Sequence, residues 1–308
     1  MSDENPNLTE EPGDESGSIS QLEAGGITPE AARRLRELGE RGAFSSDLSV
    51  ADFALCHQLG LKPLSQVMGT SVYQIGYQAP LWGAEGEMSE LSTISAAWNQ
   101  ARDRSFARLA QEAQSVGASA VVGVSVGSSV GDWAQTGGYG AVQYLVTGTA
   151  VSRSGAGDRR DGAQPRPVLT ELSVADYAKL IAAGIEPVGI VAWTSVFFVS
   201  LAYIRSGQTL FGGAAYQNFE YREVTECFYG ARERVTAELG RQAQALGASG
   251  IVGVRIHHTT RPESLNMGPG AARQGVVASF SAIGTAVAEK GRSAPAAPQM
   301  TMDMMAAS

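Results

Sequence analysis

Ala101-Arg102-Asp103-Arg104, followed by Leu109, Gly117-Ala118-Ser119 and Val121-Val122-Gly123-Val124, is a stretch of this sequence that occurs twice. The second copy is Ala231-Arg232-Glu233-Arg234, followed by Leu239, Gly247-Ala248-Ser249 and Ile251-Val252-Gly253-Val254. In each copy, apolar residues spaced by threes and fours predict a long helix, a glycine ends it, and a buried strand follows. This unit decides the fold class, which we predict to be α+β.

The repeat extends beyond this stretch and keeps the same order along the chain. Leu172-Ser173-Val174-Ala175-Asp176 repeats Leu48-Ser49-Val50-Ala51-Asp52 at an interval of 124 residues. The long helix and its strand repeat at 130 residues, and Gly284-Thr285-Ala286-Val287 repeats Gly148-Thr149-Ala150-Val151 at 136. Because the interval grows twice by six while the order is kept, the insertions fall in loops. We infer a tandem duplication of one domain.

The first copy illustrates the elements that we expect in both. Ser49 is an N-cap for a short helix, and the β-branched and aromatic residues of 63–78 predict a strand. The long helix is expected over 89–116. Strands are expected over 120–126 and 141–151, joined by a glycine-rich turn.

Composition sets the boundaries of the two domains. The 308 residues are 44% hydrophobic, which is sufficient for two cores, whereas residues 1–26 contain almost nothing to bury. Thr28 and Pro29 then predict the start of a short helix that ends at Arg41. We therefore divide the chain into an acidic disordered tail with a short helix (1–45), domain 1 (46–152), a linker (153–170), domain 2 (171–290) and a second disordered tail (291–308).

The net charge of −8 belongs mostly to the N-terminal tail. Residues 1–24 contain no Lys or Arg, and their acidic residues are Asp3, Glu4, Glu10, Glu11, Asp14, Glu15 and Glu23. The rest of the chain is close to neutral and has no basic patch, so we expect no nucleic-acid partner. The polar N-terminus does not resemble a secretory signal, and Cys56 and Cys227 lack CxxC spacing. These features predict a cytoplasmic protein with reduced thiols.

The uncharged run Val188–Ile204 allows two interpretations. Its length is at the lower limit for a transmembrane helix. The equivalent segment of domain 1 contains Ser65, Gln66 and Gln74 and cannot span a membrane. We therefore expect a strand that is buried on both faces or lies in an interface, with membrane association as the less favoured hypothesis. Its aromatic residues Trp193, Phe197 and Phe198 are the candidate interface residues.

These motifs resemble the YbjQ family, which is named for heavy-metal binding. The resemblance rests on the Ala-Arg pair within the long helix and the Ala-rich stretch that follows it, on Leu-Gly-Ala-Ser-Gly-Ile-Val-Gly-Val-Arg at Leu246–Arg255, and on the closing Gly-Thr-Ala-Val. Both copies match, over about 48–152 and 172–289. Ser125 replaces the usual Arg of the family in the first copy, and Ser119 and Ser249 replace a common Asn.

The resemblance implies two dodecin-subunit-like domains, each with one long helix packed on a small curved antiparallel sheet. It also implies a ring, usually a pentamer, in which extra strands join subunits. Free sheet edges support association, because an unpaired apolar edge strand invites aggregation.

A metal site is the main chemical alternative. His257 and His258 follow a strand, where neighbouring side chains face opposite sides, so only symmetry-related copies of one His could converge on zinc or copper. Cys227 on the second long helix is a further candidate ligand, although a small buried thiol is the simpler interpretation. No ligand-spaced cluster occurs in the chain, so we favour solvent-exposed histidines. We expect no cofactor, with a divalent or soft metal ion as the alternative.

Arg102 and Arg232 occupy matching positions on the two long helices, and we expect a structural role at a subunit joint. The alternative is an anion site at a ring pore. The sequence predicts a non-enzymatic oligomeric scaffold, with acidic and Met-containing tails that bind protein partners. The hypotheses of metal binding and of membrane association through Val188–Ile204 remain open at this point.

Overall fold

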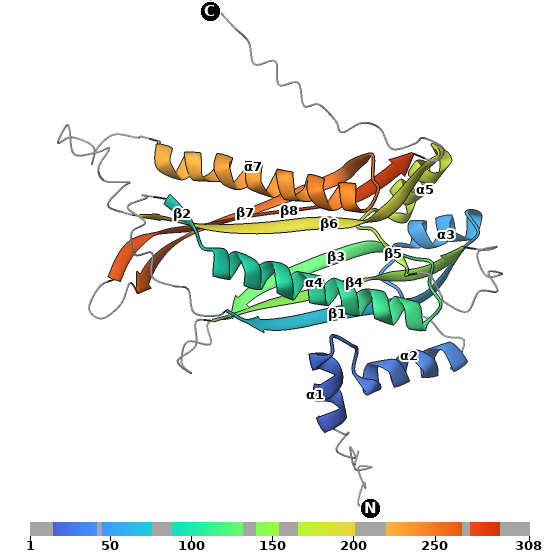
Figure 1. Cartoon of the computed structure of the whole chain (residues 1–308). Helices are drawn as coiled ribbons and strands as arrows, with labels where there is room; N and C mark the ends of the chain where they lie inside the picture. The colour runs from blue at the N-terminus through green and yellow to red at the C-terminus, as the bar shows by residue number, and fades with distance from the viewer. Residues whose placement is uncertain are drawn as a thin grey trace, which may run out of the picture.

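The computed structural model describes residues 15–41, 45–75, 88–131, 140–153, 166–200, 220–266 and 272–289. Figure 1 shows two β-sheets, each accompanied by a long helix. The strand orders are β1-β4-β3-β5 in one sheet and β2-β6-β8-β7 in the other. The predicted α+β class, with antiparallel sheets and a long helix, is confirmed. We call residues 45–153 the first half and residues 166–289 the second half.

The first half contains a short helix, a long helix and the strands that follow it. Its elements are α3 (Val50–Gln58), β1 (Leu61–Gln74), β2 (Met88–Glu90), α4 (Ser92–Ser115), β3 (Ala120–Gly131) and β4 (Ala141–Arg153). β4 is central and pairs antiparallel with both β1 and β3. A close approach holds α4 on this sheet, because a Cβ atom added at Gly69 would lie 2.0 Å from the Ser105 carbonyl oxygen. Only glycine fits there.

The second half has the same sequence of long elements. They are β5 (Val168–Leu169), α5 (Val174–Ala182), β6 (Ile185–Ser200), α7 (Arg222–Ala245), β7 (Gly250–Asn266) and β8 (Ala272–Glu289). β8 is central and pairs antiparallel with β6 and β7. The run that could have been a membrane helix forms β6, a strand buried along most of its length. Among the described residues, no helix is long and apolar enough to cross a membrane.

Equivalent positions of the two halves have the same local structure. Ser49 caps α3 and Ser173 caps α5, each by accepting the amide hydrogen of the aspartate three residues later. The glycine after each long helix, Gly117 or Gly247, has a positive φ. Both strands that follow these glycines contain a bulge, each with a positive-φ glycine. The residues that the sequence repeats are therefore those that set caps, helix ends and bulges.

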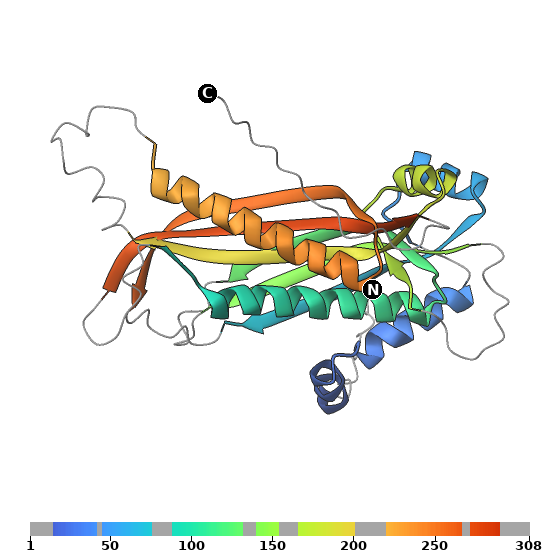
Figure 2. The same ribbon diagram turned by 45° about the horizontal axis from the view of Figure 1, so that its top comes forward.

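The first long helix lies between the two sheets. Figure 1 shows α4 between β6 and β1, whereas α7 lies on the outer side of the second sheet. Figure 2 shows both long helices running along the sheets, with α3 and α5 together at one end of the molecule. α4 contacts β1 and β4 of its own half and also β6 of the second half. The two halves consequently share one interface, in which α4 is the central element.

Two helices precede the first half. α2 (Pro29–Arg41) has the predicted bounds, and Thr28 accepts the Ala31 amide hydrogen at its start. Leu35 of α2 is buried, and the helix contacts α4 and β1. α1 (Glu15–Glu23) is a difference from our prediction, since it lies in the tail that we expected to be disordered. The chain thus forms a helix where composition alone indicated none.

Other predictions differ in their bounds or cannot be compared. β3 continues to Gly131 and so includes Gly127 and Gly131 of the predicted turn, because each residue of 125–131 pairs with a residue of β4. The tail 291–308, residues 1–14, most of the predicted linker and the last four residues of the Val188–Ile204 run lie outside the described residues.

Candidate functional site

The halves are joined by an exchange of short strands. β2 precedes α4 in the chain but pairs antiparallel with β6 of the second half. β5 precedes the second half but pairs in parallel with β3 of the first. The Thr170 amide donates to the Val121 carbonyl at 2.9 Å, and the Gly123 amide donates to the Leu172 carbonyl at 2.9 Å. Each half thus covers an edge of the other sheet, which is the usual way of protecting an exposed edge strand.

Polar side chains at the start of α4 complete the hydrogen bonds of β6. The Asn99 amide donates to the Thr194 carbonyl at 2.8 Å and accepts the Thr194 amide hydrogen at 3.0 Å. The Ser95 hydroxyl accepts the Val196 amide hydrogen at 2.9 Å. Asn99 and Ser95 are 4% exposed, so these bonds lie out of water. Buried backbone groups need such partners, and here a helix supplies them to a strand edge.

Arg102 adds a charge to this interface. It is 4% exposed, and its guanidinium donates to Asn99 Oδ1 and lies 2.7 Å from the Asp103 carboxylate. The same guanidinium lies 5.8 Å from the centre of the Trp193 ring, on the second half. Arg102 therefore orients Asn99 and reaches across the joint.

Apolar residues of both halves pack beside this polar row. Leu91 of the first half belongs to one cluster with Val196, Phe198 and Val277 of the second. Phe198 is 2% exposed and Phe197 is 9% exposed, so both predicted interface residues are buried within the chain. Phe197 belongs to the core under α7, and the partly buried Trp193 packs against that core.

Polar contacts also hold the segment 168–172, which pairs with β3 of the first half, to the rest of the second half. The Glu171 carboxylate is 2.7 Å from the Arg255 guanidinium on β7. Burial raises the pKa of Glu171, although Arg255 partly opposes this. The Thr170 and Thr285 hydroxyls share a hydrogen bond of 3.0 Å. The segment 168–172 is therefore held between β3 of one half and β7 of the other.

Arg232 differs from its counterpart Arg102. It is exposed on α7, and no ion pair or hydrogen bond joins it to another described residue. The neighbouring Arg234 instead lies 2.9 Å from Glu90 of β2. Matching positions in the sequence thus have different surroundings in this chain.

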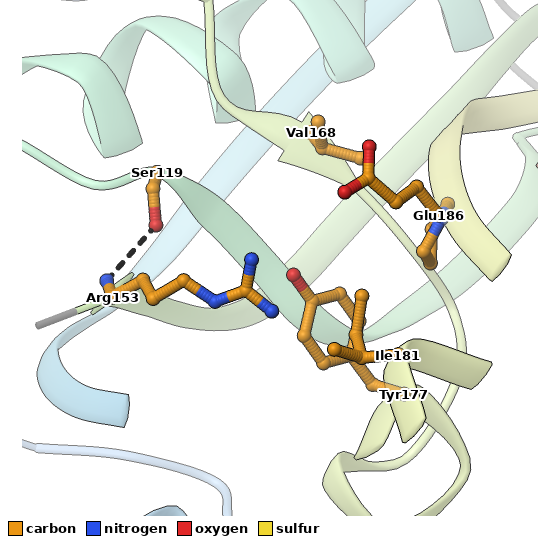
Figure 3. A pocket seen from close by; sticks show the side chains of 7 residues that line it. Ser119, Arg153, Val168, Tyr177, Ile181 and Glu186 are labelled. Carbon is orange, nitrogen blue, oxygen red and sulfur yellow. Dashed lines mark hydrogen bonds between the residues drawn. The ribbon is translucent and has the colours of Figure 1, made fainter. Parts of the chain in front are cut away.

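A small pocket also lies between the halves. Its volume is about 200 Å³, and Ser119 and Arg153 line it from the first half, with Tyr177 and Glu186 from the second. Figure 3 shows the Arg153 guanidinium directed toward the Tyr177 hydroxyl, with the Glu186 carboxylate across the pocket. Burial raises the pKa of Tyr177, and nearby Arg153 opposes the shift. The lining residues supply no histidine or cysteine, and we regard the pocket as part of the joint.

The candidate metal ligands do not come together within one chain. His257 and His258 are exposed on β7, and the His258 ring makes an edge contact with Phe228 at 5.4 Å. Cys227 is fully buried in the core of the second half, and burial raises its pKa to about 11. In the described part of the chain, no three His, Cys, Asp or Glu residues are grouped to hold a metal ion.

Sequence reasoning singles out Arg102 but misses Ser95 and Asn99, the other two polar residues that build the interface. Ser95, Asn99 and Arg102 follow one another at spacings of four and three, so they share one face of α4. The prediction of this helix used only its apolar residues, which form one stripe along it. A row of polar residues at helical spacing beside the apolar stripe could have indicated this interface. Such a row distinguishes a helix with two buried faces from a helix with one.

Comparison with known proteins gives a family match and a relative. The model of the YbjQ family, described as "Putative heavy-metal-binding", matches residues 84–154. The encapsulin nanocompartment protein Rv1762c of Mycobacterium tuberculosis (strain ATCC 25618 / H37Rv) is 30% identical over 239 residues. These residues are 76% of this chain and 85% of the relative. No solved structure matches the chain.

Proposed function

This chain belongs to the family of the encapsulin nanocompartment protein Rv1762c, and we propose that it is a non-enzymatic structural subunit that self-associates into a nanocompartment-type assembly. The single observation that carries the proposal is the strand exchange between the halves. Buried side chains of α4 complete the backbone hydrogen bonds of β6, so these polar groups join the two halves, which supports a structural role. The name of the relative agrees with such a role.

We further propose that the chain arose by duplication, with domains at 46–152 and 171–290. The repeated caps, glycines and bulges support this proposal. The buried Glu112 and its counterpart Gln242 support it as well, because each accepts a strand amide hydrogen at an equivalent position, from Met68 and from Ala192. A duplicated domain that binds its own copy is already equipped for self-association.

The proposed function is tested by the mass of the untagged full chain under native conditions. We expect one or a few defined species at multiples of 32.1 kDa, and a closed ring or shell in electron micrographs. A single species of 32.1 kDa at all concentrations would contradict the proposal. Dilution is the matched control, since a specific assembly keeps its defined mass until it dissociates to the chain mass.

We propose metal binding as a second candidate function, supported by the description of the matching family model. His257 and His258 are exposed on the edge strand β7, so assembly could bring symmetry-related imidazoles together. Elemental analysis of the untagged assembly tests this directly. Stoichiometric zinc or copper that is lost in His257→Ala or His258→Ala would support it, and metal-free assemblies that do not take up added zinc would refute it.

A further inference from the structure

Each half leaves residues exposed whose counterparts in the other half are buried in the joint between the halves. Val174 at the start of α5 is 1% exposed, because it packs with Val122 and other residues of the first half. Its counterpart Val50, at the start of α3, is 88% exposed. A valine that the second half buries in the joint is thus left in solvent on the first half.

The long helices and the strands that receive them show the same contrast. Asn99 of α4 is 4% exposed, whereas its counterpart Tyr229 on α7 is 66% exposed. Val196 of β6, which lies under α4, is 3% exposed, whereas its counterpart Val72 on β1 is 57% exposed. Among the described residues, the second half therefore has a helix face that no strand covers, and the first half has a strand edge that no helix covers along its whole length.

A third contrast lies at the edge strands that follow the long helices. β5 covers the edge of β3, and Val124 on β3 is 1% exposed. β7 is the last strand in the order of its sheet, and its residue Val254 is 46% exposed. An apolar position that the first half buries is therefore left exposed on the edge strand of the second half.

We infer that the second half of one copy binds the first half of another copy through the contacts that join the halves within one chain. α7 and β7 take the places of α4 and β3. β1 and α3 of the other copy take the places of β6 and α5. The inference rests on the proposed self-association and specifies its geometry, with a second copy of this chain as the only occupant.

The outer edge of β1 has backbone groups that can form hydrogen bonds in this contact. Alternate residues of a strand direct their backbone groups to the same edge, and Met68 and Thr70 already use this edge for α4 of their own half. The next residue of this series, Val72, has no hydrogen-bond partner on its outer edge in the described residues. By the equivalence, Thr225 would take the place of Ser95, and Val72 would take the place of Val196.

The N-terminal helices leave this part of β1 open. Arg108 donates to the Leu22 carbonyl of α1 and to the Thr70 carbonyl of β1, and Arg34 of α2 pairs with Glu112. These contacts lie at the Met68–Thr70 end of the edge. The equivalence has one exception, because α4 has Arg108 at the position where α7 has Glu238. The proposed joint therefore depends on aromatic and apolar contacts, and Tyr229 is its exposed anchor.

This arrangement is heterologous, so copies add head to tail and form a ring if the rotation closes. Every copy contributes one first half and one second half, and any such ring contains an even number of halves. A ring of five halves is therefore excluded for this chain. A pentamer would contain five chains and ten halves.

The test uses variants of the full chain that block one end each. Tyr229→Arg places a charge on the α7 face, and Val50→Arg places one at the start of α3. The matched controls introduce the same arginine at exposed positions outside the proposed contact, Ala237→Arg on α7 and Gln58→Arg on α3. Masses are measured under native conditions for each variant and for an equal mixture of Tyr229→Arg and Val50→Arg.

We expect both controls to keep the wild-type mass and each blocking variant to fall to 32.1 kDa. The mixture should stop at two chains, because the open first half of Tyr229→Arg meets the open second half of Val50→Arg. Wild-type mass in both blocking variants, or a mixture that remains monomeric, would overturn the inference while leaving self-association intact. A monomeric wild type would instead overturn the proposed function.

Discussion

Arg102 and Arg232 stand at equivalent positions on the two long helices, yet only Arg102 is buried. Its guanidinium binds Asn99 and faces the Trp193 ring of the second half, whereas Arg232 points into solvent. The difference arises because α4 lies between two sheets and α7 covers one. Among the described residues, one of two equivalent helices thus has a strand edge of the other half as its partner, and the second does not.

Asn99→Ala tests how much the joint contributes to stability. The change removes two hydrogen bonds to Thr194 and leaves a buried amide and a buried carbonyl without partners. Each unsatisfied group costs about 1–3 kcal/mol, so we expect the free energy of unfolding to fall by about 3 kcal/mol in urea titrations. The exposed Gln111→Ala on the same helix should change it by less than about 0.5 kcal/mol. Equal effects of the two substitutions would contradict this account of the joint.

Glu112→Gln should stabilise the protein at neutral pH. Burial raises the pKa of Glu112, although the Met68 amide and Arg34 partly lower it. The folded state therefore holds this proton more strongly than the unfolded chain, and stability is lost as the pH rises from about 4.3 through the raised pKa. Glutamine keeps the acceptor without the charge, as Gln242 does in the second half.

We expect Glu112→Gln to add about 1 kcal/mol to the free energy of unfolding at pH 7, and nothing below about pH 4, where both side chains are neutral. Glu238→Gln is the control with the opposite sign. A hydrogen bond from Arg241 lowers the pKa of Glu238, so this substitution should reduce stability at pH 7. A loss of stability in Glu112→Gln at pH 7 would show that the carboxylate is favourably placed.

Gly69→Ala tests the close approach of α4 to β1. The added Cβ would meet the Ser105 carbonyl oxygen at 2.0 Å and the Leu109 amide nitrogen at 2.7 Å, and both are backbone atoms that cannot turn aside. We expect destabilisation of about 3 kcal/mol, at the upper end of the usual cost of overpacking. Gly240→Ala, which meets nothing within 4 Å on α7, should instead stabilise by about 0.5–1 kcal/mol. Thermal unfolding of the two variants measures both changes, and a tolerated Gly69→Ala would contradict the packing.

The two thiols should be unreactive in the folded protein. Cys56 and Cys227 are fully buried, and burial raises the pKa of both thiols, that of Cys227 to about 11. The thiolate is the reactive form, so we expect no alkylation by iodoacetamide in native buffer and complete alkylation in urea. Ala51→Cys, at an exposed site of α3, serves as the positive control. Rapid labelling of native Cys227 would restore it as a candidate metal ligand.

The sequence predicted local structure wherever a short pattern controls it. Thr28 and Pro29 placed the start of α2, and Ser49 placed that of α3, because capping depends on neighbours in the chain. The repeat also indicated that Val188–Ile204 is a strand. The sequence could not predict which elements contact that strand. β2 and α4 precede it by about 100 residues and are separated from it by the rest of the first half.

The candidate site was harder to predict than the elements for a related reason. Arg102 and Arg232 are identical residues in matching motifs, so no property of either residue tells which one is buried. That depends on the position of each half in the chain. His257 and His258 are candidates because of their chemistry, yet Asn99, an ordinary amide side chain, makes two hydrogen bonds between the halves.

Electron cryomicroscopy of the assembled wild-type chain tests the central claim most directly. We expect the joint between chains to superpose on the joint within each chain, with Thr225 of one copy against Val72 of the next, as Ser95 lies against Val196, and with no two-fold axis between identical surfaces. An assembly in which α7 faces solvent, or in which identical surfaces meet across a two-fold axis, would contradict the account.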